Sequence, residues 1–536
     1  MSYSYILENF KAISSSQKVP IKPITLIFGA NSSGKSSLIH SLLLANEAIN
    51  TGELDISKTK VGGESVDIGG FQQYVYGRDI NRNVKWGIEY NVDGLSKRLK
   101  QIFEGVNKVK VEVVFGMKNS LDLNYLGRPS LLEYIIYTDG EELIKLTRNK
   151  KGKLNFKDIF IENSVIDKIL ESIILQNTTT TRVGSDDIDA LHPYVKKLRK
   201  ELNIKEGLFL PVGLLLNDSG QENRLFYPIS KGDRAADLSN AIKLFLPWII
   251  HEIIRGINKT IEDEINKLQY LGPLRSYPPR HFTISGQMDA DWIASGGYTW
   301  EILRKDSQVR EKVNTWLSSE NRLKTPYQLM VRDLIDMQQL SEYLYNEFID
   351  IEQSPNKDLN IFKGKLKNFN KFDFSGIKRL KELILLDKRS NKIVSHRDVG
   401  IGISQIIPVL VSSFSSSNKV VAIEQPELHL HPALQAEMAD VFIESALGKG
   451  KNTFILETHS EHLILRVMRR IRETSANRIP ENLPPITPND VSILFVEPID
   501  NNKESVVRVL ELDQDGELLD PWPGGFFEEG FRERFS

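Results

Sequence analysis

The sequence of 536 residues contains no cysteine. Disulfides and thiolate metal sites are therefore excluded, and a reducing compartment, the cytoplasm, is expected. An excess of charge is also missing, because 69 Lys and Arg stand against 71 Asp and Glu. Any surface for nucleic acid must then be local. The most apolar windows, such as 244–254, are far too short to span a bilayer, and residues 1–5 do not begin a signal peptide, so we expect no membrane association.

What is present is the composition of a folded chain, 40% hydrophobic and 26% charged, at a length that predicts several lobes. Residues 85–156 alternate apolar and polar side chains between turns, which predicts an antiparallel meander. Residues 159–374 have a mostly helical pattern without a lasting heptad repeat. The apolar runs 420–423 and 453–456 are typical of buried parallel strands, and residues 491–512 predict a final hairpin.

The strongest motif is the glycine loop Gly29–Ser36, which follows an apolar strand pattern and precedes a helical one. This is the context of a phosphate-binding P-loop, because glycines let successive backbone N–H groups face the phosphates. The alternative is an ordinary Gly/Ser loop. Lys35 is placed to reach the β- and γ-phosphates, and the hydroxyl of Ser36 is placed to bind Mg²⁺. The predicted nucleotide-binding residues here are Gly29, Asn31, Ser32, Ser33, Gly34, Lys35, Ser36 and Ser37.

Two buried strand patterns end in polar residues at the edge where ligands bind in parallel sheets. The strand 420–423 ends at Glu424, which is the Walker B arrangement of a carboxylate that holds Mg²⁺ through water. His459 follows the strand 453–456, where it can sense a γ-phosphate. Taken alone, an ordinary polar turn explains the first segment equally well, and a lone histidine is usually just a loop residue. With the P-loop, both favour a nucleotide site.

The glycine-containing segment 398–405 precedes an apolar helical pattern, 406–414. A helix N-terminus offers free N–H groups to an anion, so Gly400, Gly402 and Ser404 predict a second phosphate contact. One phosphate chain cannot sit in two such loops of one globule unless they face each other. The segment therefore indicates a dimer with shared sites, although a capped turn is the plainer alternative.

These four segments, in this order, resemble the ATP-binding-cassette superfamily, and within it the SMC-like and overcoming-lysogenisation-defect (OLD) type ATPases of the AAA group. The opening Leu7–Lys11, the Asn-Ser-Ser filling of the P-loop and Pro426–Pro432 are similar to that group. Tyr270–Arg275 and Trp522–Phe527 resemble a subfamily of bacterial ATPases that ends in a small domain of unknown function. Such ATPases frequently belong to antiphage defence systems, among them Septu-like and retron-associated modules, in which a separate nuclease or toxin is the effector.

The resemblance implies an α/β fold: a P-loop ABC-type ATPase head with an antiparallel β lobe and an inserted helical region. We predict the two halves of the head at 1–157 and 375–490, the helical insertion at 158–374 and a small C-terminal hairpin domain at 491–536. The implied cofactors are ATP and Mg²⁺, and the implied metal-binding residues are Ser36 and Glu424. The implied assembly is at least a dimer.

The resemblance also implies a composite site. The P-loop of one subunit would be closed over the γ-phosphate by Ser404 and its neighbouring glycines from a second subunit. Gln72 or Gln73 would be the Q-loop glutamine that touches Mg²⁺ or the attacking water, with a solvated turn as an equal alternative. His459 would occupy the switch-histidine position.

Gln425 departs from the family pattern. The family has a glutamate there that orients the attacking water, whereas an amide cannot accept the water's proton. A general-base contribution of about 10²–10⁴-fold would be missing. Either Glu427 or His459 substitutes, or hydrolysis is slow and ATP mainly holds a dimer together. We favour slow hydrolysis, and we count Glu424, Gln425, Glu427 and His459 as the candidate catalytic residues.

Three weaker features bear on nucleic acid. Ile493–Glu497 resembles the first strand of a TOPRIM nuclease domain and Asp513–Gly516 supplies two acids, but these acids fall in a predicted turn, so we expect no intrinsic nuclease. The segment 275–282 mixes arginines with aromatics, which fits nucleic acid, ATP or a packed segment. Arginines 466, 469, 470 and 472 crowd one predicted helix, where a salt-bridged face is commoner than a phosphate-binding one.

The leading hypothesis is an ATP-binding, slowly hydrolysing ATPase that dimerises on ATP and acts as sensor or scaffold for a separate effector encoded nearby. One alternative is an SMC-like DNA-repair ATPase that acts directly on DNA. The near-neutral charge and the lack of coiled-coil arms disfavour it. Another is an ABC transporter subunit, which the wide separation of the two head halves disfavours.

Overall fold

The computed structural model describes residues 3–117, 128–177, 183–207, 209–215, 234–276, 291–320, 322–352, 379–394, 399, 401–499 and 504–527. The chain divides into two compact units. The first consists of Met1–Arg275, Ala290–Ser295 and Ser416–Ser536, and the second of Ser276–Asp289 and Gly296–Ser415. The predicted boundaries at 158, 375 and 491 do not coincide with the borders of these units.

A six-stranded sheet forms the centre of the first unit. Its strands are, in order, β11 (Leu268–Leu271), β15 (Val420–Glu424), β16 (Thr453–Glu457), β3 (Ile24–Gly29), β17 (Val491–Ile499) and β18 (Glu504–Leu510). Neighbours from β11 to β17 are parallel, and β18 returns antiparallel. The strands β15, β16 and β3 are buried throughout, as expected where helices cover both faces of a parallel sheet. The flanking helices are α1 (Lys35–Thr51), α12 (Pro432–Leu447) and α13 (Glu461–Ser475).

The C-terminal hairpin is part of this sheet. β17 pairs in parallel with β3, from Val491 opposite Ile24 to Val496 opposite Gly29. The backbone N–H of Ser505, on β18, donates to the carbonyl of Ala12 at 2.8 Å. The hairpin is as predicted, but the separate hairpin domain expected at 491–536 is wrong, because β17 completes the sheet beside the P-loop strand.

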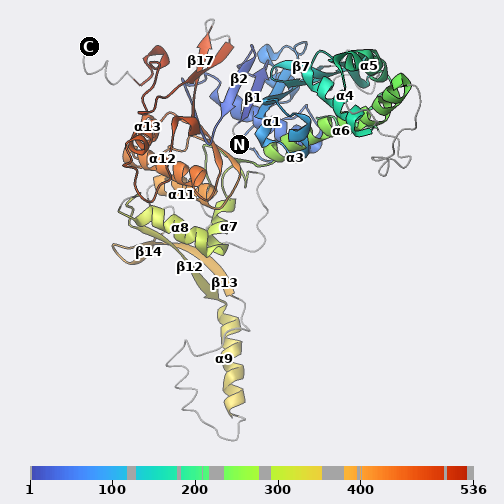
Figure 1. The fold of residues 1–536 in the computed structure, drawn as a ribbon. Helices are drawn as coiled ribbons and strands as arrows, with labels where there is room; N and C mark the ends of the chain where they lie inside the picture. Colours follow the sequence, from blue (N-terminus) through green and yellow to red (C-terminus); the bar gives the residue numbers. More distant parts are fainter. Residues whose placement is uncertain are drawn as a thin grey trace. The chain divides into compact units, whose positions relative to one another are not determined.

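A seven-stranded antiparallel sheet forms the second layer of the same unit, and the predicted meander is confirmed as β4 to β8. The strands are, in order, β2 (Gln17–Ile21), β1 (Tyr3–Glu8), β4 (Val84–Asn91), β5 (Lys108–Met117), β6 (Pro129–Thr138), β7 (Glu141–Arg148) and β8 (Leu154–Ile159). Helices α4 (Ser164–Asn177), α5 (Ser185–Leu198) and the long α6 (Arg234–Ile265) lie beside this sheet (Figure 1). The predicted α/β class with an antiparallel β lobe is thus confirmed. Shorter elements are α2 (Phe71–Tyr74), α3 (Lys97–Ile102), β9 (Ile204–Lys205) and β10 (Gly213–Leu214).

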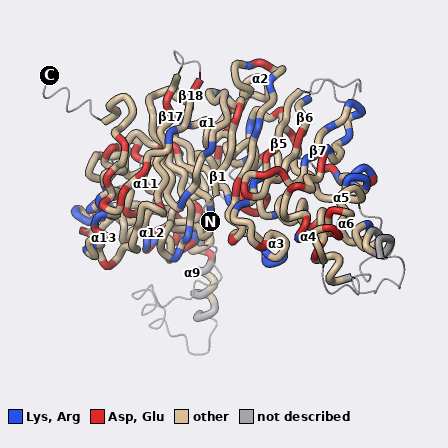
Figure 2. Tube along the Cα trace, turned by 45° about the horizontal axis from the view of Figure 1, so that its top comes forward, with Lys and Arg blue, Asp and Glu red and all other residues tan. Residues whose placement is uncertain are grey.

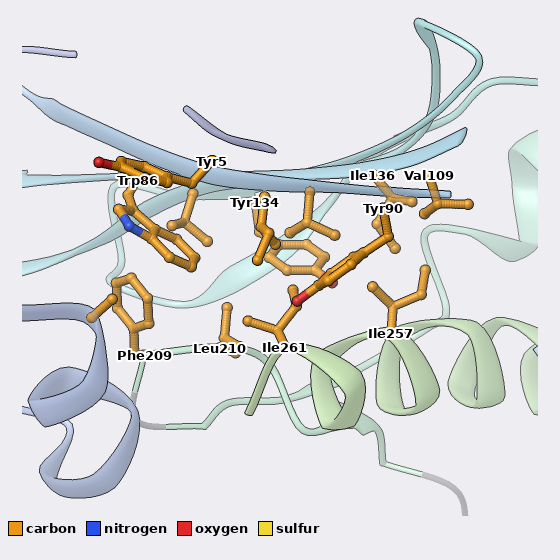
Figure 3. Close-up of a cluster of buried hydrophobic side chains, with 14 of the residues drawn as sticks. Tyr5, Trp86, Tyr90, Val109, Tyr134, Ile136, Phe209, Leu210, Ile257 and Ile261 are labelled. Carbon is orange, nitrogen blue, oxygen red and sulfur yellow. The ribbon is translucent and has the colours of Figure 1, made fainter. Parts of the chain in front are cut away.

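The core of this lobe lies between the antiparallel sheet and α6 (Figure 3). Aromatic side chains from the strands meet isoleucines from the helix, which recur every four residues on one helical face. Each large side chain buried in this way contributes roughly 1.5–3 kcal/mol. The residues labelled in Figure 3 are all buried: Tyr5, Trp86, Tyr90, Val109, Tyr134, Ile136, Phe209, Leu210, Ile257 and Ile261.

The second unit is a three-stranded antiparallel sheet with helices. Its elements are α7 (Tyr298–Lys305), α8 (Ser307–Ser318), β12 (Tyr327–Ile335), α9 (Met337–Glu352), β13 (Arg379–Asp387), β14 (Lys392–Val394) and α11 (Ile401–Phe414). The sheet order is β12-β13-β14. Trp316 of α8 stacks on Phe414 of α11, with ring centroids 6.0 Å apart. Among the helices that the structure describes, none is long and apolar enough to cross a membrane.

Candidate functional site

The glycine loop joins β3 to α1 with backbone angles that side chains rarely allow. Gly29 has φ 146° and Gly34 has φ 92°. A Cβ on Gly29 would lie 2.4 Å from the carbonyl oxygen of Val496, so glycine is required for the close approach to β17. The hydroxyl of Ser33 is buried and has no hydrogen-bond partner among the described residues. A glycine-lined loop with an unsatisfied buried hydroxyl fits a phosphate cradle.

Lys35 turns its ammonium into this loop. Its Nζ donates to the carbonyl of Gly29 at 3.2 Å and to that of Ala30 at 2.8 Å. Burial lowers the pKa of Lys35, while the nearby carboxylates of Glu457, Glu427 and Glu424 act in the opposite direction. The lysine therefore stands where a phosphate would compete with the loop's own carbonyls.

Two acids end neighbouring strands side by side. Glu424 is the last residue of β15 and Glu457 the last of β16, and the two are paired in register. Both are buried, at 8% and 6% exposure. The hydroxyl of Ser36 donates to Glu457 at 2.7 Å, and the hydroxyl of Tyr270, on β11, donates to Glu424 at 3.0 Å. Burial, and then the charge of Glu424, raises the pKa of Glu457 to about 7.

Carboxylate and hydroxyl oxygens are ligands that suit Mg²⁺, which keeps several waters and takes few protein ligands. Within the described residues, no group of three or more His, Cys, Asp or Glu is arranged to hold a metal ion. Two carboxylates and the hydroxyl of Ser36 nevertheless fit a cation that is bound mainly through nucleotide phosphates.

A polar chain leads away from Glu424 to a cavity. His40 Nε2 lies 3.4 Å from Glu424 Oε1, and His40 Nδ1 lies 2.6 Å from Lys11 Nζ. Burial lowers the pKa of His40, and burial also lowers the pKa of Lys11 to about 8. Lys11 lines a cavity of about 650 Å³ together with Gln73 and Arg78, among others. Both candidate glutamines are exposed, and of the two Gln73 is the one that lines this cavity with Lys11.

The turn after β15 is held in an uncommon conformation. Gln425 has φ 46°, in the left-handed region. Its backbone N–H donates to the carbonyl of Glu457 at 2.7 Å. Arg275, buried at 5% exposure, donates from Nη2 to the carbonyls of Glu424 at 3.0 Å and Gln425 at 2.9 Å. Burial lowers the pKa of Arg275 to about 10. Arg275 is therefore a buried residue that stabilises the turn through its backbone carbonyls.

Glu427 connects this turn to the next one. One carboxylate oxygen accepts the hydroxyl of Thr458 at 2.8 Å, and the other accepts the backbone N–H of His459 at 2.7 Å. Burial raises the pKa of Glu427. Burial, and then the charge of Lys35, lowers the pKa of His459. Glu427 therefore positions the histidine turn.

The structure thus gathers the P-loop, Glu424, Gln425, Glu427 and His459 at one edge of the central sheet. Gly402 and Ser404 belong to the second unit, and their closure over a phosphate stays a prediction. They lie in the first turn of α11, which begins at Ile401, five residues before the predicted start. Gly400 lies outside the described residues.

Sequence reasoning missed four residues of this edge: His40, Tyr270, Arg275 and Glu457. The signal for Glu457 was present, because it ends a buried apolar run in the same way as Glu424. Tyr270 and Arg275 lie in a segment noted for its resemblance, but β11 is a strand of four residues and its pattern is too short to recognise.

The arginines on α13 are engaged by acids, and Figure 2 shows basic and acidic residues close together around this helix. Arg470 donates to both carboxylate oxygens of the buried Asp440, at 2.8 and 2.7 Å. The other ion pairs are Arg466 with Glu437 and Asp440, Arg469 with Glu473, Arg470 with Glu473, and Arg472 with Glu517. The helix therefore has a salt-bridged face, the commoner of the two alternatives for such a run of arginines. In the C-terminal turn, Asp513 accepts the backbone N–H groups of Asp515 and Glu517, which is a local turn arrangement.

Two family models match the chain. Residues 301–464 match the AAA ATPase domain, and residues 486–533 match a protein family of unknown function, DUF3696. The first match includes Glu424, Gln425, Glu427 and His459. The P-loop, at residues 29–36, lies outside the matched segment and supports an ATPase of this type through its own geometry. No curated protein matches the chain in sequence.

Solved structures similar to the chain include SMC head domains. One is an SMC head bound to the C-winged helix domain of ScpA, at 11% identity and a TM-score of 0.34, covering 95% of this chain and 98% of that one. Another is the SMC head domain from Thermotoga maritima, at 10% identity and 0.31, covering 95% and 98%. A third is an SMC head with an extended coiled coil bound to the C-terminal domain of ScpA, derived from Pyrococcus furiosus, at 13% and 0.33, covering 95% and 97%. At this identity and TM-score, the fold assignment depends on the chain's own strands.

Proposed function

We propose that this chain binds Mg²⁺·ATP at the P-loop, hydrolyses it slowly, and uses the bound nucleotide to bring two copies together. The observation that carries the proposal is the arrangement at one sheet edge. The loop from Gly29 to Ser36 presents Lys35, and the hydroxyl of Ser36 meets a carboxylate that ends the neighbouring strand. Bound Mg²⁺ would neutralise phosphate charge there. Ser36 and Glu424 would hold it, and Lys35 would hold the phosphates.

Slow hydrolysis is supported by what surrounds Gln425. Its amide cannot take a proton from water, and the neighbouring acid Glu427 already accepts two hydrogen bonds. His459 remains an alternative base, because burial favours its neutral form, which can accept a proton.

We further propose that the chain is an OLD-type ATPase without a TOPRIM domain, and that its ATP-bound dimer is a sensor or scaffold for a separate effector, a nuclease or toxin, in a bacterial antiphage system of the Septu-like or retron-associated kind. The support is the motif resemblance at Pro426–Pro432 and the DUF3696 match at the C-terminal end. Direct action on DNA has less support, because the arginines on α13 are bound to acids of the same unit.

The first experiment measures binding of a fluorescent ATP analogue and the mass of the particle with and without Mg²⁺·ATP. We expect micromolar binding and an ATP-dependent dimer. Lys35→Ala should lose both, whereas Gly402→Glu should keep nucleotide binding and lose the dimer. A wild-type protein that fails to bind Mg²⁺·ATP overturns the proposal, and one that binds but stays monomeric overturns the shared site.

The second experiment tests the scaffold role. The product of the neighbouring gene is coexpressed and the two are purified together. A stable complex that depends on Lys35 supports the scaffold. If no neighbour binds and the purified protein binds DNA tightly in an ATP-dependent way, the DNA-repair alternative replaces it.

A further inference from the structure

Glu457 lies closer to the P-loop in the sheet than the acid that motif reasoning selects. β16 pairs directly with β3, and β15 lies one strand further away. A carboxylate that ends β16 therefore faces the P-loop helix without an intervening strand. The hydrogen bond from Ser36 to Glu457, at 2.7 Å, is the direct consequence of this order.

Glu424 is oriented by other groups. It accepts the hydroxyl of Tyr270 at 3.0 Å, and His40 lies 3.4 Å away. Glu457 is oriented by Ser36, whose hydroxyl is itself placed for the cation. Two buried carboxylates side by side repel each other, and a divalent cation is the group that relieves such repulsion.

We propose that Glu457 is a second acidic group of the divalent-cation site, which then contains two carboxylates, Glu424 and Glu457, and the hydroxyl of Ser36. This inference rests on the proposed binding of Mg²⁺·ATP. A site with two carboxylates would repel a triphosphate without Mg²⁺ more strongly than a site with one carboxylate. Without the cation, the two acids repel the triphosphate, so nucleotide binding depends steeply on Mg²⁺.

A purely structural role for Glu457 makes a different prediction. If Glu457 only accepted the hydroxyl of Ser36, then Glu457→Gln would change little, because an amide oxygen also accepts a hydrogen bond. The amide lacks the charge that attracts Mg²⁺ and repels phosphate. Glu457→Gln therefore removes the charge of this side chain and keeps its ability to accept a hydrogen bond.

The test is a titration of a fluorescent ATP analogue in excess Mg²⁺, in a Mg²⁺ series and in EDTA. For Glu457→Gln, we expect the Mg²⁺ concentration at half-saturation to rise about tenfold or more and the affinity in EDTA to increase about tenfold, both from loss of one negative charge. Glu457→Asp should keep the weak EDTA affinity of the wild type. Exposed Glu481→Gln is the control for an acid outside the site, and melting temperatures verify folding.

The outcomes are distinguishable. Wild type that does not bind Mg²⁺·ATP ends the proposed function. Wild type that binds, with Glu457→Gln unchanged in both its Mg²⁺ requirement and its EDTA affinity, overturns the role of Glu457 alone. The same holds if Glu481→Gln gives equal shifts.

Discussion

The backbone N–H of His459 donates to the carboxylate of Glu427 at 2.7 Å, so the histidine turn is attached to the turn after the neighbouring strand. The second carboxylate oxygen is taken by the hydroxyl of Thr458. An acid with both oxygens in such contacts mainly maintains the distance between two turns. A role of Glu427 in positioning the two turns can therefore be distinguished by experiment from a role as the general base.

Glu427→Gln and Thr458→Val should therefore have similar effects. Each removes a hydrogen bond between the two turns, and a loss of about 1–1.5 kcal/mol in positioning lowers turnover about tenfold. Phosphate release under saturating Mg²⁺·ATP measures it. If Glu427→Gln abolishes turnover and Thr458→Val leaves it normal, Glu427 is the replacement base and the positioning role is wrong.

Gln425→Glu should raise the turnover number. The variant places a carboxylate where the family orients the attacking water, and a general base contributes about 10²–10⁴-fold. Single-turnover measurements with radiolabelled ATP separate the chemical step from product release. Gln425→Asn is the matched control, since it keeps an amide. Equal rates for wild type and Gln425→Glu would show that the rate is limited elsewhere.

Tyr134→Phe should destabilise the antiparallel lobe. The buried hydroxyl of Tyr134 donates to Asn258 of α6 at 2.7 Å, and its removal leaves a buried amide oxygen without that donor. We expect a loss of about 1–3 kcal/mol in the free energy of unfolding, measured by chemical denaturation. Tyr137→Phe is the control, because its hydroxyl bonds to Glu112 in a less buried place and should cost under about 1 kcal/mol. Equal losses would contradict the assignment.

Substitutions of two arginines on α13 should differ sharply in their effect on stability. Arg470→Gln removes the bidentate partner of the buried Asp440, which keeps its ion pair with Arg466, and should cost about 2–3 kcal/mol. Arg469→Gln breaks an exposed pair with Glu473 and should cost less than about 1 kcal/mol. Thermal unfolding measures both. Neither should change DNA affinity in a filter-binding assay, and a large loss of binding in Arg469→Gln would revive a phosphate role for this helix.

The strongest sequence signals were local ones. The strand, loop and helix around Lys35 and the apolar runs ending at Glu424 and Glu457 lie where their patterns place them. A continuous run of buried residues is enough to identify a central parallel strand. The candidate acids follow from the same runs, and Glu457 ends its run two residues before His459, the residue to which the motif assigns the role.

The features that the sequence did not predict depend on pairing between segments that are far apart in the chain. No pattern within 491–499 indicates that its partner is Ile24–Gly29, so a strand of the central sheet resembled a separate hairpin. The role of Arg275 depends on backbone carbonyls, which carry no residue signature. The identity of a side chain predicts whether it is buried better than it predicts which residues it contacts.

The position of β3 between β16 and β17 has a consequence for how the chain folds. Both partners of this strand are made more than 400 residues after it, so during synthesis β3 has neither neighbour until those residues have been made. Contacts of such long sequence separation form slowly. Nucleotide binding should therefore be among the last properties that a newly made chain acquires, and fragments that end before β17 should neither bind nucleotide nor compete with full-length copies for a place in the dimer.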